Sequence, residues 1–190
     1  MVAQQAEPYL KELFLKTNLF KTNNIKIIRR EDCDDQLSKI YDQVCGVDYT
    51  VSTFDTSVNL GWRALRFWRT RYPDRYVYNS FSIRVKRNKL NSEEHCEANK
   101  RLTAIYNDTA FPQYMAQAHY DPDYGELLSL GLAKTKDIFE CYDKGLFREC
   151  NKYAKNKDVY FRDVHWEVMK KHGYTVYEWY LDNSCKSKSA

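Results

Sequence analysis

The stretch Gly46-Val47-Asp48-Tyr49-Thr50-Val51 joins a predicted helix to a predicted strand, and the order of elements around it decides the fold. Before it, apolar residues at helical spacing predict a helix over 34–44, with Asp35 favouring its positive end. After the glycine that ends this helix, β-branched and aromatic residues predict a strand over 47–53. Asp48 therefore places a carboxylate at the start of a strand, directly after a helix.

Strands and helices are mixed on both sides of this stretch. Alternating patterns and flanking turn residues predict further strands over 61–68, 76–87, 111–120, 126–133 and 174–181. Helices are predicted over 7–16, after the capping residues 91–92, from 135 to 145 and around 162–171. This order predicts the α/β (α+β) class, with a mixed β-sheet flanked by helices.

The chain of 190 residues has the usual length of one compact domain. No internal repeat, low-complexity tract or proline-rich linker divides it. We therefore expect a single domain over 1–190. In it, an N-terminal helical segment (1–33) and a C-terminal helix–strand extension (146–190) flank a core (34–145).

Composition argues against several classes of protein. No run approaches the roughly 18 apolar residues that a membrane span requires, and no secretory signal pattern is seen, so we expect a cytoplasmic protein without a membrane partner. The six cysteines include no CxxC pair and no zinc-finger spacing, so we expect reduced thiols. Glycine-rich phosphate-binding loops are absent.

One segment concentrates the positive charge of the chain. Between residues 63 and 89, nine arginine and lysine side chains stand against one acid, Asp74, which gives the segment a formal charge of +8 in a chain whose total is +4. Arginine outnumbers lysine seven to two. These cations are interleaved with aromatic residues, namely Trp62, Phe67, Trp68, Tyr72, Tyr76, Tyr78 and Phe81.

This composition predicts nucleic-acid binding, with DNA expected rather than RNA. Cations neutralise phosphates and release counterions, aromatic rings stack on unpaired bases, and the planar guanidinium group suits phosphate. The candidate contacts are Arg63, Arg66, Arg69, Arg84, Arg87 and Trp68. An alternative stays open, in which the aromatic residues belong to the core and the arginines to a solvated strand face.

A helix, then Gly-Val-Asp opening a strand, then a hairpin to a second and third strand and a capped helix resembles the PD-(D/E)XK nuclease superfamily. The resemblance covers about 34–120 and is nearest to phage and bacterial members. In that family the next strand carries Asp/Glu-x-Lys; the two acids bind metal and the lysine positions the attacking water. The resemblance thus implies a restriction-endonuclease-like core, with Asp48 holding Mg²⁺ and Asp35 and Lys86 completing the catalytic group.

The sequence departs from the family at the second position. The next predicted strand offers Arg66-Phe67-Trp68 and the later one Arg84-Val85-Lys86, neither with an acid before a lysine. An acid could be supplied instead by Asp35, Glu93 or Glu94. The chain is thus expected either to hydrolyse phosphodiesters with a degenerate motif or to bind without cutting. For Asp48, a carboxylate that pairs with a nearby arginine is the alternative.

A third function remains open from the sequence. Sixteen tyrosines and four tryptophans suit a protein interface, such as that of a phage or mobile-element factor that binds a host protein without catalysis. The aromatic stretch 174–180 either closes the sheet or pairs two subunits in a homodimer.

Overall fold

The computed structural model describes residues 2–22, 24–40, 45–67, 70, 79–87, 96–150 and 159–181. No helix among these residues is long and apolar enough to cross a membrane.

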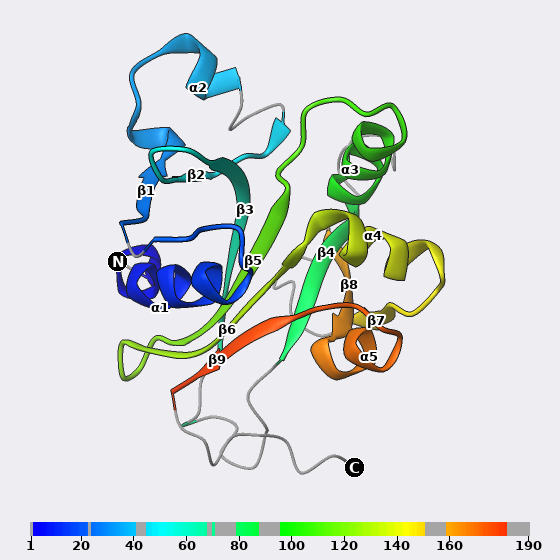
Figure 1. Ribbon diagram of the computed structural model, residues 1–190. Coiled ribbons are helices and arrows are strands. Elements are labelled where there is room, and N and C mark those ends of the chain that lie inside the picture. Colours follow the sequence, from blue (N-terminus) through cyan, green and yellow to red (C-terminus); the bar gives the residue numbers. More distant parts are fainter. Residues whose placement is uncertain are drawn as a thin grey trace.

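A six-stranded mixed sheet, sheet A, forms the centre of the molecule (Figure 1). Its strands in spatial order are β1 (Lys26–Arg29), β2 (Tyr49–Ser52), β3 (Ser57–Arg66), β5 (Tyr114–Asp121), β6 (Glu126–Lys134) and β9 (Tyr177–Tyr180). All neighbours are antiparallel except β3 and β5, which are parallel. The predicted α/β class with a mixed sheet flanked by helices is confirmed.

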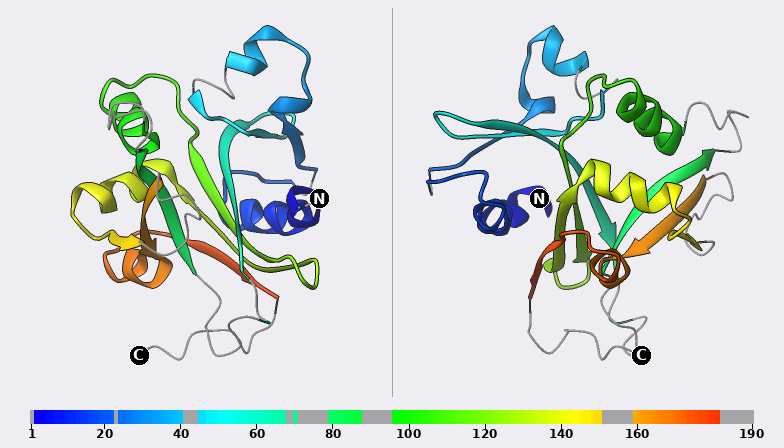
Figure 2. Two further views of the ribbon diagram at one scale, coloured as in Figure 1. Left: turned by 180° about the vertical axis from the view of Figure 1, so that it is seen from behind. Right: turned by 45° about the vertical axis from the view of Figure 1, so that its right-hand side comes forward.

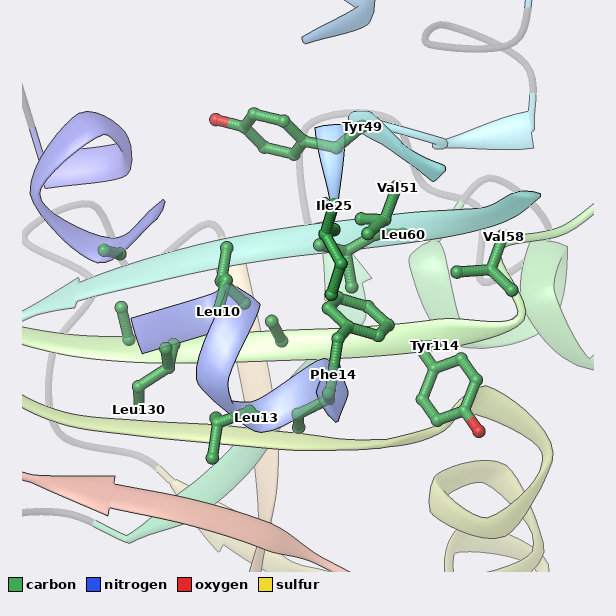
Figure 3. Close-up of a cluster of buried hydrophobic side chains, with 14 of the residues drawn as sticks. Leu10, Leu13, Phe14, Ile25, Tyr49, Val51, Val58, Leu60, Tyr114 and Leu130 are labelled. Carbon is green, nitrogen blue, oxygen red and sulfur yellow. The ribbon is translucent and has the colours of Figure 1, made fainter. Parts of the chain in front are cut away.

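Helix α1 (Val2–Lys16) covers one face of sheet A (Figure 3). The residues Leu10, Leu13 and Phe14 carry the apolar stripe of this helix and are at most 2% exposed. The Phe14 ring meets Tyr114 of β5 edge-on, with ring centres 5.7 Å apart. The predicted N-terminal helix is confirmed and begins earlier, at Val2.

A second, three-stranded sheet, sheet B, lies on the other face of sheet A from α1 (Figures 1 and 2). Its order is β4 (Ser80–Arg87), β8 (Val159–His165) and β7 (Arg148–Cys150), all antiparallel. A second hydrophobic cluster joins the sheets, with Met115 of sheet A packed among Phe81, Ile83 and Trp166.

Strand β4 corrects one prediction. We expected 76–87 to follow 61–68 in one sheet, but β3 has β5 as its neighbour on one side and β2 on the other, so β4 pairs with β8. The predicted helix around 162–171 is also wrong in its first turn. Residues 162–165 belong to β8, and helix α5 (Trp166–Lys171) begins only after them.

The remaining helices are α2 (Gln36–Ile40), α3 (Glu97–Tyr106) and α4 (Thr135–Asp143), with a 3₁₀ turn, η1, at Arg30–Asp32. In α2 the apolar stripe faces outward: Leu37 is 61% and Ile40 46% exposed, whereas Ser38 is buried. The reason is polar, because Arg30 Nη1 donates to Ser38 Oγ over 3.1 Å. Helix α4 begins at Thr135, as predicted, and its N-cap is Lys134.

Candidate nucleic-acid interface

Strand β4 is an edge strand of sheet B, and side chains of sheet A satisfy its outward backbone groups. Gln117 of β5 makes two of these bonds: its Nε2 donates to Ser80 O over 2.7 Å, and its Oε1 accepts the Ser82 N–H over 2.8 Å. Arg63 of β3 makes a third, with Nη1 donating to Ser82 O over 2.9 Å. These polar side chains of β3 and β5 thereby make the hydrogen bonds that a further strand would make to β4.

Glu97, the first residue of α3, completes this row. Its Oε2 accepts the Arg84 N–H over 3.2 Å and also pairs with Arg63 Nη2. The side chains of Arg63 and Glu97 are only 20% and 14% exposed. The pair is therefore largely shielded from solvent and fixes the Arg63 guanidinium against the edge of β4.

One face of sheet B is polar, and we define it by Ser82, Arg84, Phe161, Asp163 and Arg148. Ser82 and Asp163 are buried, Arg84 and Phe161 are half-buried, and Arg148 is exposed. Ser82 pairs with Asp163 and Arg84 with Phe161 across β4 and β8, and Asp163 pairs in turn with Arg148 of β7. The alternate residues Phe81, Ile83 and Val164 lie in the second hydrophobic cluster. Because successive side chains of a strand point to opposite faces, the polar face is directed away from that cluster.

Three arginines from three strands meet at the polar face. The Arg63 guanidinium carbon lies 5.5 Å from the centre of the Phe161 ring. Arg148 Nε lies 3.5 Å from Asp163 Oδ2. Arg84 is half-buried, and its Nε is buried without a hydrogen-bond partner among the described residues. Positive charge from β3, β4 and β7 is thus gathered around one aromatic ring.

Asp48 precedes β2 and is bound to the neighbouring strand. Its Oδ2 accepts the Trp62 N–H over 2.6 Å, and its own N–H donates to Leu60 O over 3.0 Å. The next-strand residues beside Asp48 are therefore 60–62, several positions before the Arg66-Phe67-Trp68 stretch that we aligned with the acid-x-lysine motif. Arg63 is the cation that follows them.

A second carboxylate, Glu97, and a half-buried arginine, Arg101, lie in the electrostatic surroundings of Asp48. Arg101 of α3 donates through Nη2 to Gly46 O over 2.8 Å and through Nη1 to Cys45 O. Burial lowers the pKa of Arg101, and the negative charges of Glu97 and Asp48 oppose that shift. Asp48 and Glu97 thus both act electrostatically on the Arg101 guanidinium.

The other predicted catalytic residues lie elsewhere or beyond description. Asp35 is exposed and caps α2, where its Oδ1 accepts the Ser38 N–H over 2.7 Å. Lys86 lies in β4, and a bulge in the strand separates it from Arg84. Glu93 and Glu94 fall outside the described residues. The catalytic roles of Asp35, Lys86 and Asp48 stay predictions.

The predicted nucleic-acid contacts divide between two faces. Arg66 is exposed and, by strand alternation, lies on the opposite face of β3 from Arg63. Arg87 pairs with Val159 through its backbone in β4. Trp68 and Arg69 fall outside the described residues. Arg63 and Arg84 are the two predicted cations that the described structure brings together.

Among the aromatic residues of the basic segment, Phe67 and Phe81 are 3% and 1% exposed. Trp62 packs against the hydrophobic cluster that α1 forms with sheet A. The core alternative therefore holds for these three. Sequence reasoning missed Glu97, Phe161 and Arg148. Glu97 lies just beyond the acids that we considered, and Phe161 and Arg148 lie in a region where we did not predict strands.

A buried polar pair lies beneath the interface. His119 of β5 is fully buried, and its Nδ1 lies 2.9 Å from Ser129 Oγ of β6. Burial lowers the pKa of His119 to about 3. The neutral imidazole is therefore a structural group within the sheet, next to Gln117.

The fit of the site to Mg²⁺ can be judged from its donors. Mg²⁺ prefers one or two carboxylates with water and substrate phosphate. Glu97 is paired with Arg63, and Asp48 Oδ2 with the Trp62 N–H. The described part of the chain contains no group of three or more His, Cys, Asp or Glu side chains arranged to hold a metal ion. As it stands, this donor set does not fit a two-carboxylate magnesium site.

Comparison with known proteins gives little further information. No protein-family model matches the chain, and no curated protein matches it. The solved structure of D212, a nuclease from a fusselovirus, aligns with 88% of this chain and 80% of its own, with a TM-score of 0.40 and 12% sequence identity. Similarity at this level does not define a shared fold or activity.

Proposed function

We propose that this protein binds nucleic acid through the polar face of sheet B together with Arg63. The observation that carries the proposal is the meeting of Arg63, Arg84 and Arg148 from three strands at one face. Guanidinium groups present planar pairs of donors that match phosphate oxygens. Glu97 pairs with Arg63 and Asp163 pairs with the exposed Arg148, whereas Arg84 has a buried Nε without a hydrogen-bond partner in the described structure.

Equilibrium binding of a labelled oligonucleotide at several salt concentrations tests this proposal. Arg84→Ala and Arg148→Ala are expected to weaken binding across sequences, and each to reduce the slope of log affinity against log salt by about 1. Lys11→Ala, on α1 at the far side of sheet A, is the control and should leave affinity unchanged. Arg66→Ala should have a smaller effect than Arg84→Ala, because Arg66 lies on the other face of β3. An affinity that does not change with salt, and is the same in Arg84→Ala and Arg148→Ala as in the wild type, would contradict the proposal.

Metal-dependent phosphodiester hydrolysis with Mg²⁺ at Asp48 is a separate, narrower prediction, because Asp48 lies outside the polar face. Asp48 and Asp35 are the two predicted carboxylates, and both already accept hydrogen bonds from backbone N–H groups. The test is incubation with single- and double-stranded DNA and RNA in Mg²⁺ or Mn²⁺. Cleavage abolished by Asp48→Asn would support it. Cleavage equal in wild type and Asp48→Asn would exclude a catalytic Asp48, and Asp35→Asn and Lys86→Met then test the other two predicted residues.

The second candidate function is a non-catalytic factor that binds another protein. The outward-facing apolar residues Leu37 and Ile40 of α2 favour it. Recovery of one stoichiometric protein by the wild type but not by Leu37→Ser/Ile40→Ser, with no bound nucleic acid, would support this function over the first.

A further inference from the structure

We infer that Phe161 is a stacking platform for an unpaired base, so that the ligand of the polar face is single-stranded nucleic acid. The inference rests on the proposed function and specifies its substrate class. It comes from the position of one aromatic ring among cations.

Phe161 stands apart from the hydrophobic core. It is half-buried and belongs to neither hydrophobic cluster of the described residues, in contrast to Phe81 and Val164 on the other face of sheet B. A phenylalanine on the polar face of a sheet gains little from the core. Packing in the hydrophobic clusters therefore does not explain why an aromatic residue occupies this position.

The neighbours of the ring include three arginines, of which Arg63 is paired with Glu97 and Arg148 with Asp163. Arg63 approaches the ring to 5.5 Å from its centre, a cation–π distance that also steadies the ring. Arg84 is the direct cross-strand partner of Phe161, and adjacent strands lie about 5 Å apart. Arg148 is a diagonal neighbour on β7, at a typical backbone separation of about 7–8 Å. A base on the ring would thus have cations on two sides for the flanking phosphates.

The chemistry favours unpaired over paired bases. In a duplex the base faces are buried in the stack, so the half-buried Phe161 ring would meet only base edges and phosphates. A single strand can turn its bases out onto an aromatic ring while its backbone follows the cations, and this is how sheet-surface aromatics bind single-stranded RNA in other folds. Every base has a face that can stack, so the affinity is expected to depend little on the nucleotide sequence.

The experiment compares Phe161→Leu, which stays apolar, with Phe161→Tyr, which keeps the ring. Affinity is measured for a single-stranded DNA oligonucleotide, the same sequence as RNA, and its DNA duplex, over a range of salt. Phe161→Leu should weaken single-strand binding by about 5- to 100-fold, the usual cost of losing one stacked base, without changing the salt slope. Phe161→Tyr should restore it, and duplex affinity should stay unchanged. Circular dichroism verifies that each variant is folded.

Phe54→Leu is the matched control, because Phe54 is fully exposed at the turn between β2 and β3 and lies outside the interface. Salt-dependent binding that Phe161→Leu leaves intact, or a preference for duplex, overturns the stacking inference while the proposed function stands. Absence of binding to all three nucleic acids overturns both. Fluorescence of a 2-aminopurine strand should be quenched by the wild type and by Phe161→Tyr, and less by Phe161→Leu.

Discussion

Arg63 of β3 and Glu97 of α3 form an ion pair at the edge of strand β4, and both also bond to the backbone of that strand. The pair therefore joins sheet A, helix α3 and sheet B at one point. This geometry gives Arg63 a structural task in addition to any contact with phosphate.

Replacement of Arg63 should destabilise the protein. In Arg63→Met, Ser82 O loses its donor and Glu97 loses its cation, and a buried polar group without a partner costs about 1–3 kcal/mol. Arg63→Lys should recover only part of the loss, because an ammonium group lacks the fork that reaches both partners. Urea unfolding measures the effect. An unchanged midpoint in Arg63→Met would contradict the structural role.

Replacement by alanine should destabilise the protein more at Gly46 than at Gly145. Both glycines have positive φ, +58° and +70°, so alanine incurs similar backbone strain at each. A Cβ at Gly46 would overlap the Arg101 guanidinium, whereas a Cβ at Gly145 would meet no atom of the described residues within 4 Å. Thermal unfolding should show the larger loss for Gly46→Ala, and the difference between the two variants isolates the contact with Arg101. Equal losses would mean that Arg101 moves aside at no cost.

Gly131 and Trp166 should be energetically coupled. A Cβ at Gly131 of β6 would overlap the six-membered ring of the Trp166 indole, and Trp166 is fully buried. Gly131→Ala should cost about 1–3 kcal/mol through overpacking. The double variant Gly131→Ala/Trp166→Phe should lose less stability than the sum of the losses in the two single variants. Strict additivity in a double-mutant cycle would argue against the contact.

Stability should fall in mild acid because of His119. Burial lowers the pKa of His119 from 6.5 to about 3, so the unfolded chain takes up this proton at a higher pH than the folded one. The stability that the neutral His119 imidazole contributes is therefore fully present above pH 6.5. It is lost as the pH falls toward 3, by up to about 1.4 kcal/mol per pH unit for one group. His165 also has a lowered pKa, through burial and then Arg148, and acts in the same direction.

The measurement compares urea midpoints at pH 7 and pH 5. His119→Asn retains a polar group near Ser129 but does not titrate in this range, so its loss of stability between the two pH values should be smaller than that of the wild type. A wild type and a variant with the same pH dependence would show that His119 does not contribute.

Local patterns predicted the parts of the fold that depend on neighbouring residues. The helical stripe of α1 and the turns at Gly125, Gly145 and Gly173, all with positive φ, follow from such patterns. The position of β4 does not. Its alternation predicted a strand correctly, but its partner β8 lies far along the chain, and strand choice of that kind depends on the whole sheet.

The candidate site was predicted in part for the same reason. Asp48, Arg63 and Arg84 were named from the sequence, and the structure brings the two arginines to one interface. Glu97 was not named, because its role comes from the meeting of α3 with the edge of β4. Phe161 was not named, because no local pattern shows which face of sheet B is turned away from the core.

The row of side chains along β4 has a consequence for solubility. An edge strand with free backbone groups is a template on which a strand of another molecule can add. Gln117, Arg63 and Glu97 already occupy the outward groups of Ser80, Ser82 and Arg84. The edge of β4 is thus already hydrogen-bonded within the molecule and is not open to a strand of another molecule at these positions. Variants that lose these side chains should therefore form intermolecular β-sheet aggregates at concentrations where the wild type stays monodisperse.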